Sequence, residues 1–511
     1  MIDPSRVFMR QQVEDLLGAT IGKTLLEVDK AQLFVHHAGS DYMKGIAGNI
    51  IEVSVLGCKQ DNKQEPDILV DGELTEIKTT GMVKPKKADS PYKYECKEPV
   101  SVTAVSIPVI VNEEFETSNF WHKLAHMLWV YYHYNSTEKV KLEGYKNFPI
   151  LGYQFYKFTD NDKIRLRQDW LLVRDYLIVI QAKYKTEDER KEQYPKLSSE
   201  LRGQLMLIDT APKFPNSPRF RLKRSFATTI AASCFTKPKL AELPIPITKY
   251  SDIDDKCKQL TEKYKGKSFE EIAESLGIVL SVQKKNMKEE GQEDEKPVSV
   301  KNFAELVVLK MFGSEAKSLN RIADFYKIGL IAKSLPLDSK GTPKESMKMY
   351  TPDFKELMDE GNFSDSFMRD YFSQHQFLLI VYQYTHPDRK NKDPKYIKFV
   401  GFKRAYLSDG FIDTAVWKFW YDVRHIIQDK KLRIIKEFNN DGTPKINKKS
   451  RTQREAPNFP KEGIYDVFMR GSASTAEDSS KTLVINGLKM LPQEVWLSKR
   501  VTLQLFKNTV V

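Results

Sequence analysis

The chain has 511 residues, of which 41% are hydrophobic and 29% are charged, a composition that excludes a disordered or fibrous protein. No apolar stretch approaches the length of about 18 residues that a membrane span needs, and the first ten residues lack a secretory apolar run. Four scattered cysteines without a CxxC pair argue against a disulfide framework and a zinc ribbon, and favour a reducing, cytoplasmic compartment. The net charge of +12 favours a polyanionic partner such as nucleic acid, although a merely basic soluble protein accounts for it equally well.

The first predicted element that bears on function is a helix over residues 44–52. Its sequence, Lys44-Gly-Ile-Ala-Gly-Asn-Ile-Ile-Glu52, turns Ile50 and Ile51 toward a core at helical spacing. Glu52 then offers a carboxylate to whatever lies beside the helix. The alternative interpretation of Glu52 is an ordinary solvated glutamate.

The next element is a β-hairpin over residues 65–78. Asp71 and Gly72 lie between alternating apolar residues, which is a strong hairpin signal because glycine accepts the positive φ of a tight turn. The hairpin brings Asp67 beside Glu76 and Lys78. Since Glu76 and Lys78 are two residues apart, they point to the same face of their strand. Two carboxylates and an ammonium group are predicted to converge.

That grouping suits metal-assisted hydrolysis of a phosphodiester and matches the PD-(D/E)xK nuclease pattern. Asp67 and Glu76 supply the hard oxygen ligands that Mg²⁺ prefers, Glu52 adds a third carboxylate, and Lys78 orients or deprotonates the attacking water. Glu-x-Lys alone is a weak signal, since it recurs elsewhere in the chain. Asp71 remains a weaker candidate for the first ligand, because it lies at the turn and should point away.

Further motifs occur in the order found in a known family. The chain resembles the MutH-type nucleases, which comprise the mismatch-repair nicking endonuclease and related restriction enzymes that cut at GATC. The resemblance covers about residues 10–235 and rests on the segments 44–52, 76–80, 116–129, 166–170, 181, 211–213 and 220–226.

The resemblance implies an active site made of Glu52, Asp67, Glu76, Lys78 and Lys123, with Mg²⁺ as the cofactor. For Lys123 the alternative is a solvent-facing helix lysine. The resemblance also implies a DNA-reading loop and strand in which Lys213 and Arg221 contact bases, while Lys223 and Arg224 hold phosphates. The repair nickase has an aromatic residue where this chain has Arg221, so its response to adenine methylation is not carried over.

The second half of the chain repeats the first weakly, in a unit of about 240 residues. Asp324 and Lys333 remain, but Ile331 takes the position of Glu76 and Leu309 that of Glu52, and neither side chain can ligate Mg²⁺. A reading strand persists with Trp496 and Lys499. We therefore expect the second copy to bind DNA without cutting it; the alternative is that it only packs against the first.

These observations predict an α/β protein of two tandem PD-(D/E)xK domains, each a mixed sheet flanked by helices, the second degenerate. The predicted boundaries are a catalytic domain at 1–235, a linker at 236–260 and a DNA-binding effector domain at 261–511. The function expected is that of a bacterial type II restriction endonuclease acting on double-stranded DNA, associating with itself on DNA and paired with a cognate DNA methyltransferase. The alternatives are a strand-nicking repair endonuclease and a non-catalytic DNA-binding regulator.

Overall fold

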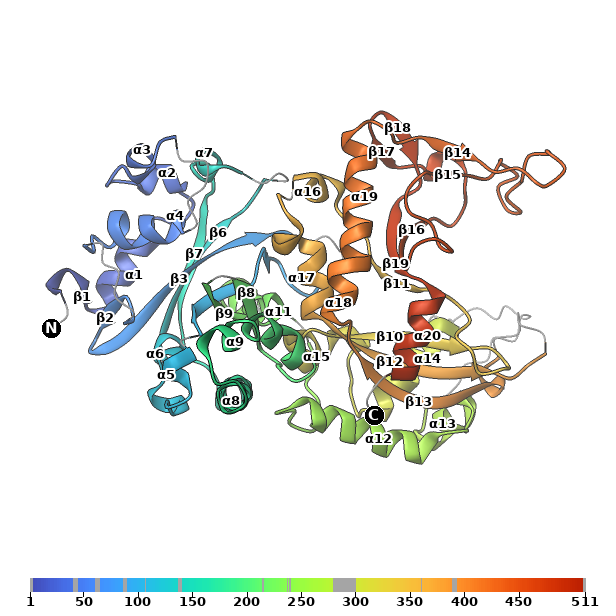
Figure 1. The fold of residues 1–511 in the computed structure, drawn as a ribbon, viewed down its shortest axis with the longest axis horizontal. Coiled ribbons are helices and arrows are strands. Elements are labelled where there is room, and N and C mark those ends of the chain that lie inside the picture. Colours follow the sequence, from blue (N-terminus) through green and yellow to red (C-terminus); the bar gives the residue numbers. More distant parts are fainter. Residues whose placement is uncertain are drawn as a thin grey trace, which may run out of the picture. The chain divides into compact units, whose positions relative to one another are not determined.

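The computed structural model describes residues 3–39, 45–59, 65–85, 90–105, 107–136, 140–213, 216–236, 238, 240–278, 300–359, 361–387 and 393–508. Contacts divide the chain into an N-terminal unit, Met1–Asp252 with Asn320–Leu330, and a C-terminal unit, Ile253–Leu319 with Ile331–Val511 (Figure 1). Part of the predicted linker is a helix, α12 (Tyr250–Tyr264). None of the helices within these ranges combines the length and apolar character that a bilayer crossing needs.

The N-terminal unit is built on a mixed sheet of six strands in the order β1-β2-β3-β6-β7, with β4 pairing β3. The pairs β1–β2 and β3–β6 are parallel, and β2–β3, β3–β4 and β6–β7 are antiparallel. The mixed α/β class is therefore confirmed. The strands are β1 (Val7–Phe8), β2 (Ile68–Val70), β3 (Glu73–Val83), β4 (Glu95–Cys96), β6 (Met127–His133) and β7 (Ile150–Tyr156).

The central strand β6 is apolar along most of its length because both of its faces are covered. Its run Met-Leu-Trp-Val-Tyr is buried without alternation, the pattern of a strand inside a layered α/β fold. Leu128 and Val130 belong to a core cluster with Val13 of α1 and with Ile50 and Ile51. The predicted core-facing role of the two isoleucines is confirmed, although the start of their predicted helix at Lys44 lies outside the described residues.

The predicted hairpin is confirmed as β2 and β3. Asp71 and Gly72 have φ angles of 48° and 84°, so both adopt the left-handed conformation that a two-residue hairpin turn requires. The register pairs Ile68 with Thr75, and one further step along it brings Asp67 opposite Glu76. Antiparallel partners point to the same face, so this register aims both carboxylates at one side of the sheet.

A second, three-stranded sheet of the N-terminal unit has the order β5-β9-β8 and is antiparallel. It is held to the long helix α8 by Asp169, whose carboxylate accepts the backbone N–H groups of Met206, Leu207 and Ile208 at 2.7–3.1 Å. Burial raises the pKa of Asp169 to about 6, while the donated hydrogen bonds oppose the rise. The strands are β5 (Val100–Ala104), β8 (Ile208–Lys213) and β9 (Asn216–Leu222).

Helices surround these two sheets. The longest, α8, begins at Thr159, which caps it by accepting the N–H of Asp162. The helices of this unit, short helical turns included, are η1 (Pro4–Arg6), α1 (Arg10–Gly18), α2 (Leu25–Val28), α3 (Leu33–His36), α4 (Ile46–Asn49), η2 (Ile50–Val55), α5 (Ile107–Ile110), η3 (Phe115–Thr117), α6 (Asn119–Ala125), α7 (Leu142–Tyr145), α8 (Asp160–Lys183), α9 (Glu187–Lys191), η4 (Tyr194–Lys196), α10 (Leu197–Leu201), α11 (Arg224–Phe235) and α15 (Ala323–Ile328).

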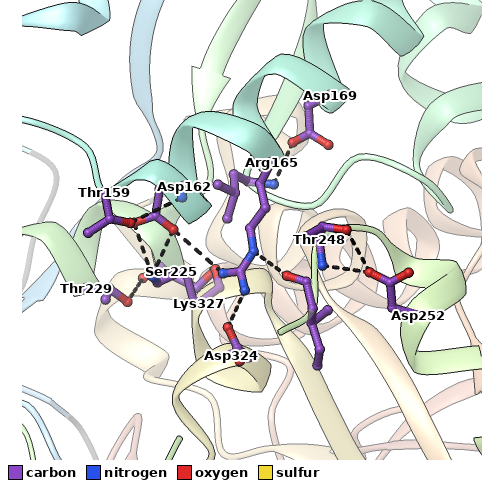
Figure 2. A network of polar contacts seen from close by, with 12 residues as sticks. Thr159, Asp162, Arg165, Asp169, Ser225, Thr229, Thr248, Asp252, Asp324 and Lys327 are labelled. Atoms are coloured by element: carbon purple, nitrogen blue, oxygen red, sulfur yellow. Dashed lines mark hydrogen bonds and ion pairs between the residues drawn. The ribbon is translucent and has the colours of Figure 1, made fainter. Parts of the chain in front are cut away.

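The last of these helices, α15, comes from the second half of the chain. It is fixed to α8 by buried ion pairs, which Figure 2 shows together: Arg165 contacts Asp324 at 2.6 Å, and Lys327 contacts Asp162 at 2.9 Å. Arg165 also donates to the carbonyl of Ile247. Removing one partner from such a pair leaves an uncompensated buried charge. The network therefore strongly favours the packing of α15 against α8 in this one position.

The C-terminal unit follows an order of elements parallel to that of the N-terminal unit. Strands β10-β12-β13 form one three-stranded sheet and β11-β19-β16 another, with α19 between them in sequence. A helical turn, η6, and a serine-capped helix, α17, precede β12, just as η3 and the serine-capped α6 precede β6. The arrangement thus mirrors β3-β6-β7, β5-β9-β8 and α8.

The helices and helical turns of this part of the chain are α13 (Phe269–Ser275), α14 (Val300–Met311), η5 (Leu319–Arg321), α16 (Phe354–Asp359), η6 (Phe363–Asp365), α17 (Phe367–Gln374), η7 (Pro394–Tyr396), α18 (Asp409–Phe411), η8 (Ile412–Val416), α19 (Trp417–Gln428), η9 (Asp478–Ser480) and α20 (Lys499–Asn508). The strands are β10 (Leu330–Leu337), β11 (Met347–Tyr350), β12 (Gln376–Tyr384), β13 (Ile397–Ala405), β14 (Ile434–Lys436), β15 (Glu455–Pro457), β16 (Val467–Gly471), β17 (Leu483–Ile485), β18 (Leu488–Met490) and β19 (Gln493–Leu497).

Candidate active site

The centre of the candidate site is Glu76, a buried carboxylate on β3 with 1% of its surface exposed. Lys123 donates to both of its oxygens, at 2.9 and 3.0 Å, and Lys78 donates to Oε1 at 2.5 Å. Lys123 reaches this point because α6 ends just before β6, whose first residue Met127 is in register with Glu76. Two ammonium groups thus meet one buried carboxylate.

Asp67 lies beside this group, at the entry to β2. Its Oδ2 accepts the backbone N–H of Ile77 at 2.7 Å, which ties the carboxylate to the neighbouring strand. Burial raises the pKa of Asp67, and the charge of Glu76 raises it further, while Lys78 and the Ile77 hydrogen bond oppose the rise. The structure therefore brings Asp67, Glu76, Lys78 and Lys123 into one electrostatic cluster.

Glu52 joins this cluster from the helical turn η2. Burial raises its pKa to about 7, and the charges of Asp67 and Glu76 add to the rise, while Arg6 and Lys78 oppose it. Three carboxylates therefore repel one another across the site. A divalent cation relieves such repulsion, and carboxylate oxygens are the ligands that Mg²⁺ takes in proteins.

The carboxylates of Glu52, Asp67 and Glu76 thus fit a magnesium ion in donor chemistry and charge, whereas Lys78 and Lys123 are cations and would not be ligands. The carboxylates are not gathered as closely as a complete ligand set: within the described part of the chain, no group of three or more His, Cys, Asp or Glu side chains is placed to hold an ion. The oxygens of Glu76 instead contact the ammonium groups of Lys78 and Lys123.

Arg6 is a member of the site that the sequence did not reveal. Its buried guanidinium donates to the carbonyl of Asp67 and to that of Lys59, both at 2.6 Å, and lies 3.8 Å from Glu52. A single arginine near the start of a chain, 61 residues from its partner, carries no motif or spacing. Only Asp3 before Pro4, which caps the short turn that ends at Arg6, was visible as a local signal.

Without divalent metal, Glu52 is expected to lower the free energy of unfolding by about 2–3 kcal/mol between pH 5 and 8, and Glu52→Gln should remove this part of the pH dependence. The reason is that the pKa of folded Glu52, about 7, lies above the ordinary 4.5. The stabilisation is complete below the ordinary pKa and is lost as pH rises through the folded one. Urea unfolding of both proteins, with a metal chelator present, measures it; equal pH slopes would contradict the expectation.

Comparison with known proteins agrees with this geometry. Residues 56–169 match the family described as DNA mismatch repair enzyme MutH. The predicted resemblance to the MutH-type nucleases is confirmed. The MutH-like segment includes Asp67, Glu76, Lys78 and Lys123, and it ends at Asp169, the residue that holds β8 to α8.

A similarity that extends beyond the MutH-like segment is to the Type II restriction enzyme Sau3AI of Staphylococcus aureus. The two are 22% identical over 424 residues, which cover 81% of this chain and 79% of that relative. Both comparisons confirm the predicted enzyme class, a site-specific deoxyribonuclease.

The predicted DNA contacts of the MutH-like part fall into different environments. Arg221 forms a two-pronged ion pair with Asp209, with both contacts at 2.8 Å, and Arg224 donates to the carbonyl of Cys96. Lys223 is only 4% exposed and donates to the carbonyl of Leu205, so the predicted phosphate contact of Lys223 is wrong. The side chain of Lys213, at the end of β8, lies outside the described residues.

In the C-terminal unit, Trp496 and Lys499 lie three residues apart in the chain but differ in exposure. Trp496 is half-buried on β19 with the guanidinium of Arg470 over its ring at 4.6 Å, whereas Lys499 is exposed at the start of α20. Because the guanidinium of Arg470 covers part of the Trp496 ring, less of the ring surface is open to contact a DNA base than we expected from the sequence.

The proposed degenerate site is not assembled as the sequence implied. Asp324 is not a counterpart of Asp67, because it lies on α15 in the N-terminal unit and pairs with Arg165. Ile331 and Lys333 do lie two apart on β10, where the ammonium of Lys333 donates to backbone carbonyls of β11. Leu309 is buried on α14.

Proposed function

We propose that the protein is a Mg²⁺-dependent type II restriction endonuclease that cuts both strands of DNA at a short palindrome, GATC. The observation that carries this proposal is the hairpin β2–β3, which aims Asp67 and Glu76 at the same face as Lys78. The relative with a restriction-enzyme name matches most of the chain, which favours this reading over a repair nickase.

In the proposed reaction, Asp67 and Glu76 hold Mg²⁺ and Glu52 completes the carboxylate set. The ion supplies a Lewis acid that acidifies water and neutralises charge on the phosphate. Lys78 positions the attacking water or accepts its proton, and Lys123 binds the scissile phosphate through its ammonium group. Hydrolysis leaves 5′-phosphate and 3′-hydroxyl ends. Arg6 keeps the backbone of Asp67 in place, since it donates to that carbonyl.

For the C-terminal unit we propose a role in binding DNA without cleavage, as an effector. Its parallel order of sheets and helices supports an origin by duplication. Aligning the capping serines Ser118 and Ser366 brings Tyr371 to the position of Lys123. The sequence repeat separately puts Ile331 at the position of Glu76. Neither the phenol, which is buried and donates to a carbonyl, nor the alkyl group replaces a metal ligand or a phosphate-binding ammonium.

One active site per chain has a consequence for the reaction course. A palindrome presents two scissile phosphates, so cutting both strands needs two chains on the DNA or two successive visits. We therefore propose self-association on DNA. A cognate methyltransferase that protects the host's own GATC sites belongs to the same proposal.

Incubation of supercoiled plasmid with the protein tests this function. With Mg²⁺ we expect nicked circles to accumulate first at limiting enzyme and linear fragments to follow, and with chelator we expect intact plasmid. The end sequences of the fragments should begin or finish at GATC. Nicked circles as the final product indicate a strand-nicking repair endonuclease, and retarded but uncut DNA indicates a non-catalytic regulator.

A further inference from the structure

The C-terminal unit carries a strongly basic segment between α19 and β16, which we call the basic arm and define as residues 430–461. Its 32 residues contain ten lysines and arginines against three acidic residues, an excess of seven positive charges in a chain whose net charge is +12. In Figure 1 the arm runs outward from β14 and β15 as extended orange-red segments. More than half of the charge excess of the protein is therefore concentrated in one element.

The basic arm has a defined backbone. Glu437 N–H donates to the carbonyl of Arg454 at 2.8 Å, Lys445 N–H to that of Glu437 at 3.0 Å, and Arg454 N–H to that of Lys445 at 2.7 Å, so three stretches of chain lie side by side. At the tip, Asn447 N–H donates to the carbonyl of Thr452. The two lysines between them, Lys448 and Lys449, are thus presented on an ordered turn.

Most of the charge of the arm is exposed and not neutralised by its own acids. The carboxylate of Glu437 lies 3.6 Å from both Lys445 and Arg454, and that of Asp441 accepts from Thr443. Lys431 pairs with Asp429, just before the arm, at 2.9 Å. Among the described residues, no ion pair within 4 Å involves six further exposed cations of the arm, which are Lys430, Arg433, Lys436, Lys448, Lys449 and Arg451.

The corresponding stretch of the N-terminal unit, between α8 and β8, is different in both structure and charge. Residues 184–207 form α9, η4 and α10 and contain five basic and five acidic residues. The N-terminal unit therefore connects α8 to β8 without a basic arm. The excess positive charge of the basic arm is therefore particular to the C-terminal unit. The N-terminal unit makes the corresponding connection without it, so the fold does not require this charge for stability.

We propose that the basic arm binds the sugar–phosphate backbone of duplex DNA without reading its sequence. The exposed cations of the tip are the compact point charges of Lys448 and Lys449 and the guanidinium of Arg451, all of which suit phosphate oxygens, and phosphate contacts carry no sequence information. This proposal rests on the proposed DNA-binding role of the C-terminal unit and assigns that role to a particular element.

The test compares two variants of the full chain, both in a Glu76→Gln background that does not cleave. The arm variant carries Lys436→Gln, Lys448→Gln and Lys449→Gln. Its matched control loses the same three charges at exposed lysines elsewhere in the C-terminal unit, through Lys340→Gln, Lys355→Gln and Lys489→Gln. Binding to duplexes of about 30 base pairs, with and without GATC, is measured over a range of salt concentrations.

We expect the arm variant to bind both duplexes about 10- to 100-fold more weakly near 0.1 M salt, and its slope of log K against log salt to fall by about two, since each phosphate contact contributes about 0.9. The control should change much less. Unchanged affinity and slope in the arm variant, or a loss confined to the GATC duplex, would overturn the assignment of the arm alone. Failure of the Glu76→Gln parent to bind either duplex would overturn the proposed function itself.

Discussion

Replacement of Glu76 by glutamine is expected to lower the rate of plasmid cleavage by about three orders of magnitude and to leave DNA binding in place. Metal ions supply several kcal/mol of transition-state stabilisation, and each 1.36 kcal/mol is a factor of ten in rate. Glutamine keeps the shape of Glu76 but removes the charge that faces Lys78 and Lys123. Single-turnover cleavage of a GATC duplex measures the effect directly.

The chain offers a matched pair of lysines as a control for this result. In the sequence repeat Lys333 takes the place of Lys78. Lys78 contacts the carboxylate of Glu76, whereas Lys333 donates to backbone carbonyls of β11. Lys78→Gln should abolish cleavage as Glu76→Gln does, and Lys333→Gln should leave it nearly unchanged. Because Glu76→Gln and Lys78→Gln each disturb the buried charge cluster around Glu76, thermal unfolding of every variant must confirm that the fold persists. Full activity of Glu76→Gln in folded protein would refute the assignment.

Replacement of Asp169 by alanine is expected to destabilise the protein by about 3–5 kcal/mol. The side chain is 1% exposed, and its two oxygens accept three backbone N–H groups at the start of β8. Alanine leaves those donors buried without a partner, and each such group costs about 1–3 kcal/mol before the structure relaxes. The expected effect of this substitution is therefore on stability, although Asp169 lies in one of the segments that carry the family resemblance.

Urea unfolding of Asp169→Ala measures this loss, and Asp175→Ala on the same helix is the control. The side chain of Asp175 is 61% exposed and pairs with the neighbouring Arg174, so its removal should change stability by less than about 0.5 kcal/mol. Asp169→Asn should fall between the two, because its single carbonyl oxygen satisfies only part of the donor set. Equal stability of Asp169→Ala and Asp175→Ala would show that the three hydrogen bonds contribute nothing.

Some features of the fold and of the candidate site could be predicted from local sequence, and others could not. The hairpin could be predicted because a turn of Asp71 and Gly72 is decided by local φ preferences, and its register then fixes which side chains share a face. The prediction for Lys223 came from the family resemblance and that for Asp324 from the internal repeat, and the structure places both side chains elsewhere. A lysine after a basic strand resembles a phosphate ligand in sequence, but packing buries Lys223 against the carbonyl of Leu205.

The sequence by itself therefore determined the β2–β3 hairpin and the meeting of Asp67 with Glu76 and Lys78, since both depend on residues within a dozen positions of one another. The mixed α/β class followed from the family resemblance carried by several spaced motifs. The tertiary structure alone decided the parts that join distant segments. Arg6 reaches Asp67 across 61 residues, and Asp324 pairs with Arg165 across 159. Such pairs form between side chains that only tertiary packing brings together, because a buried charge needs a partner in the folded state. The local periodicity of the sequence does not specify which residue that partner is.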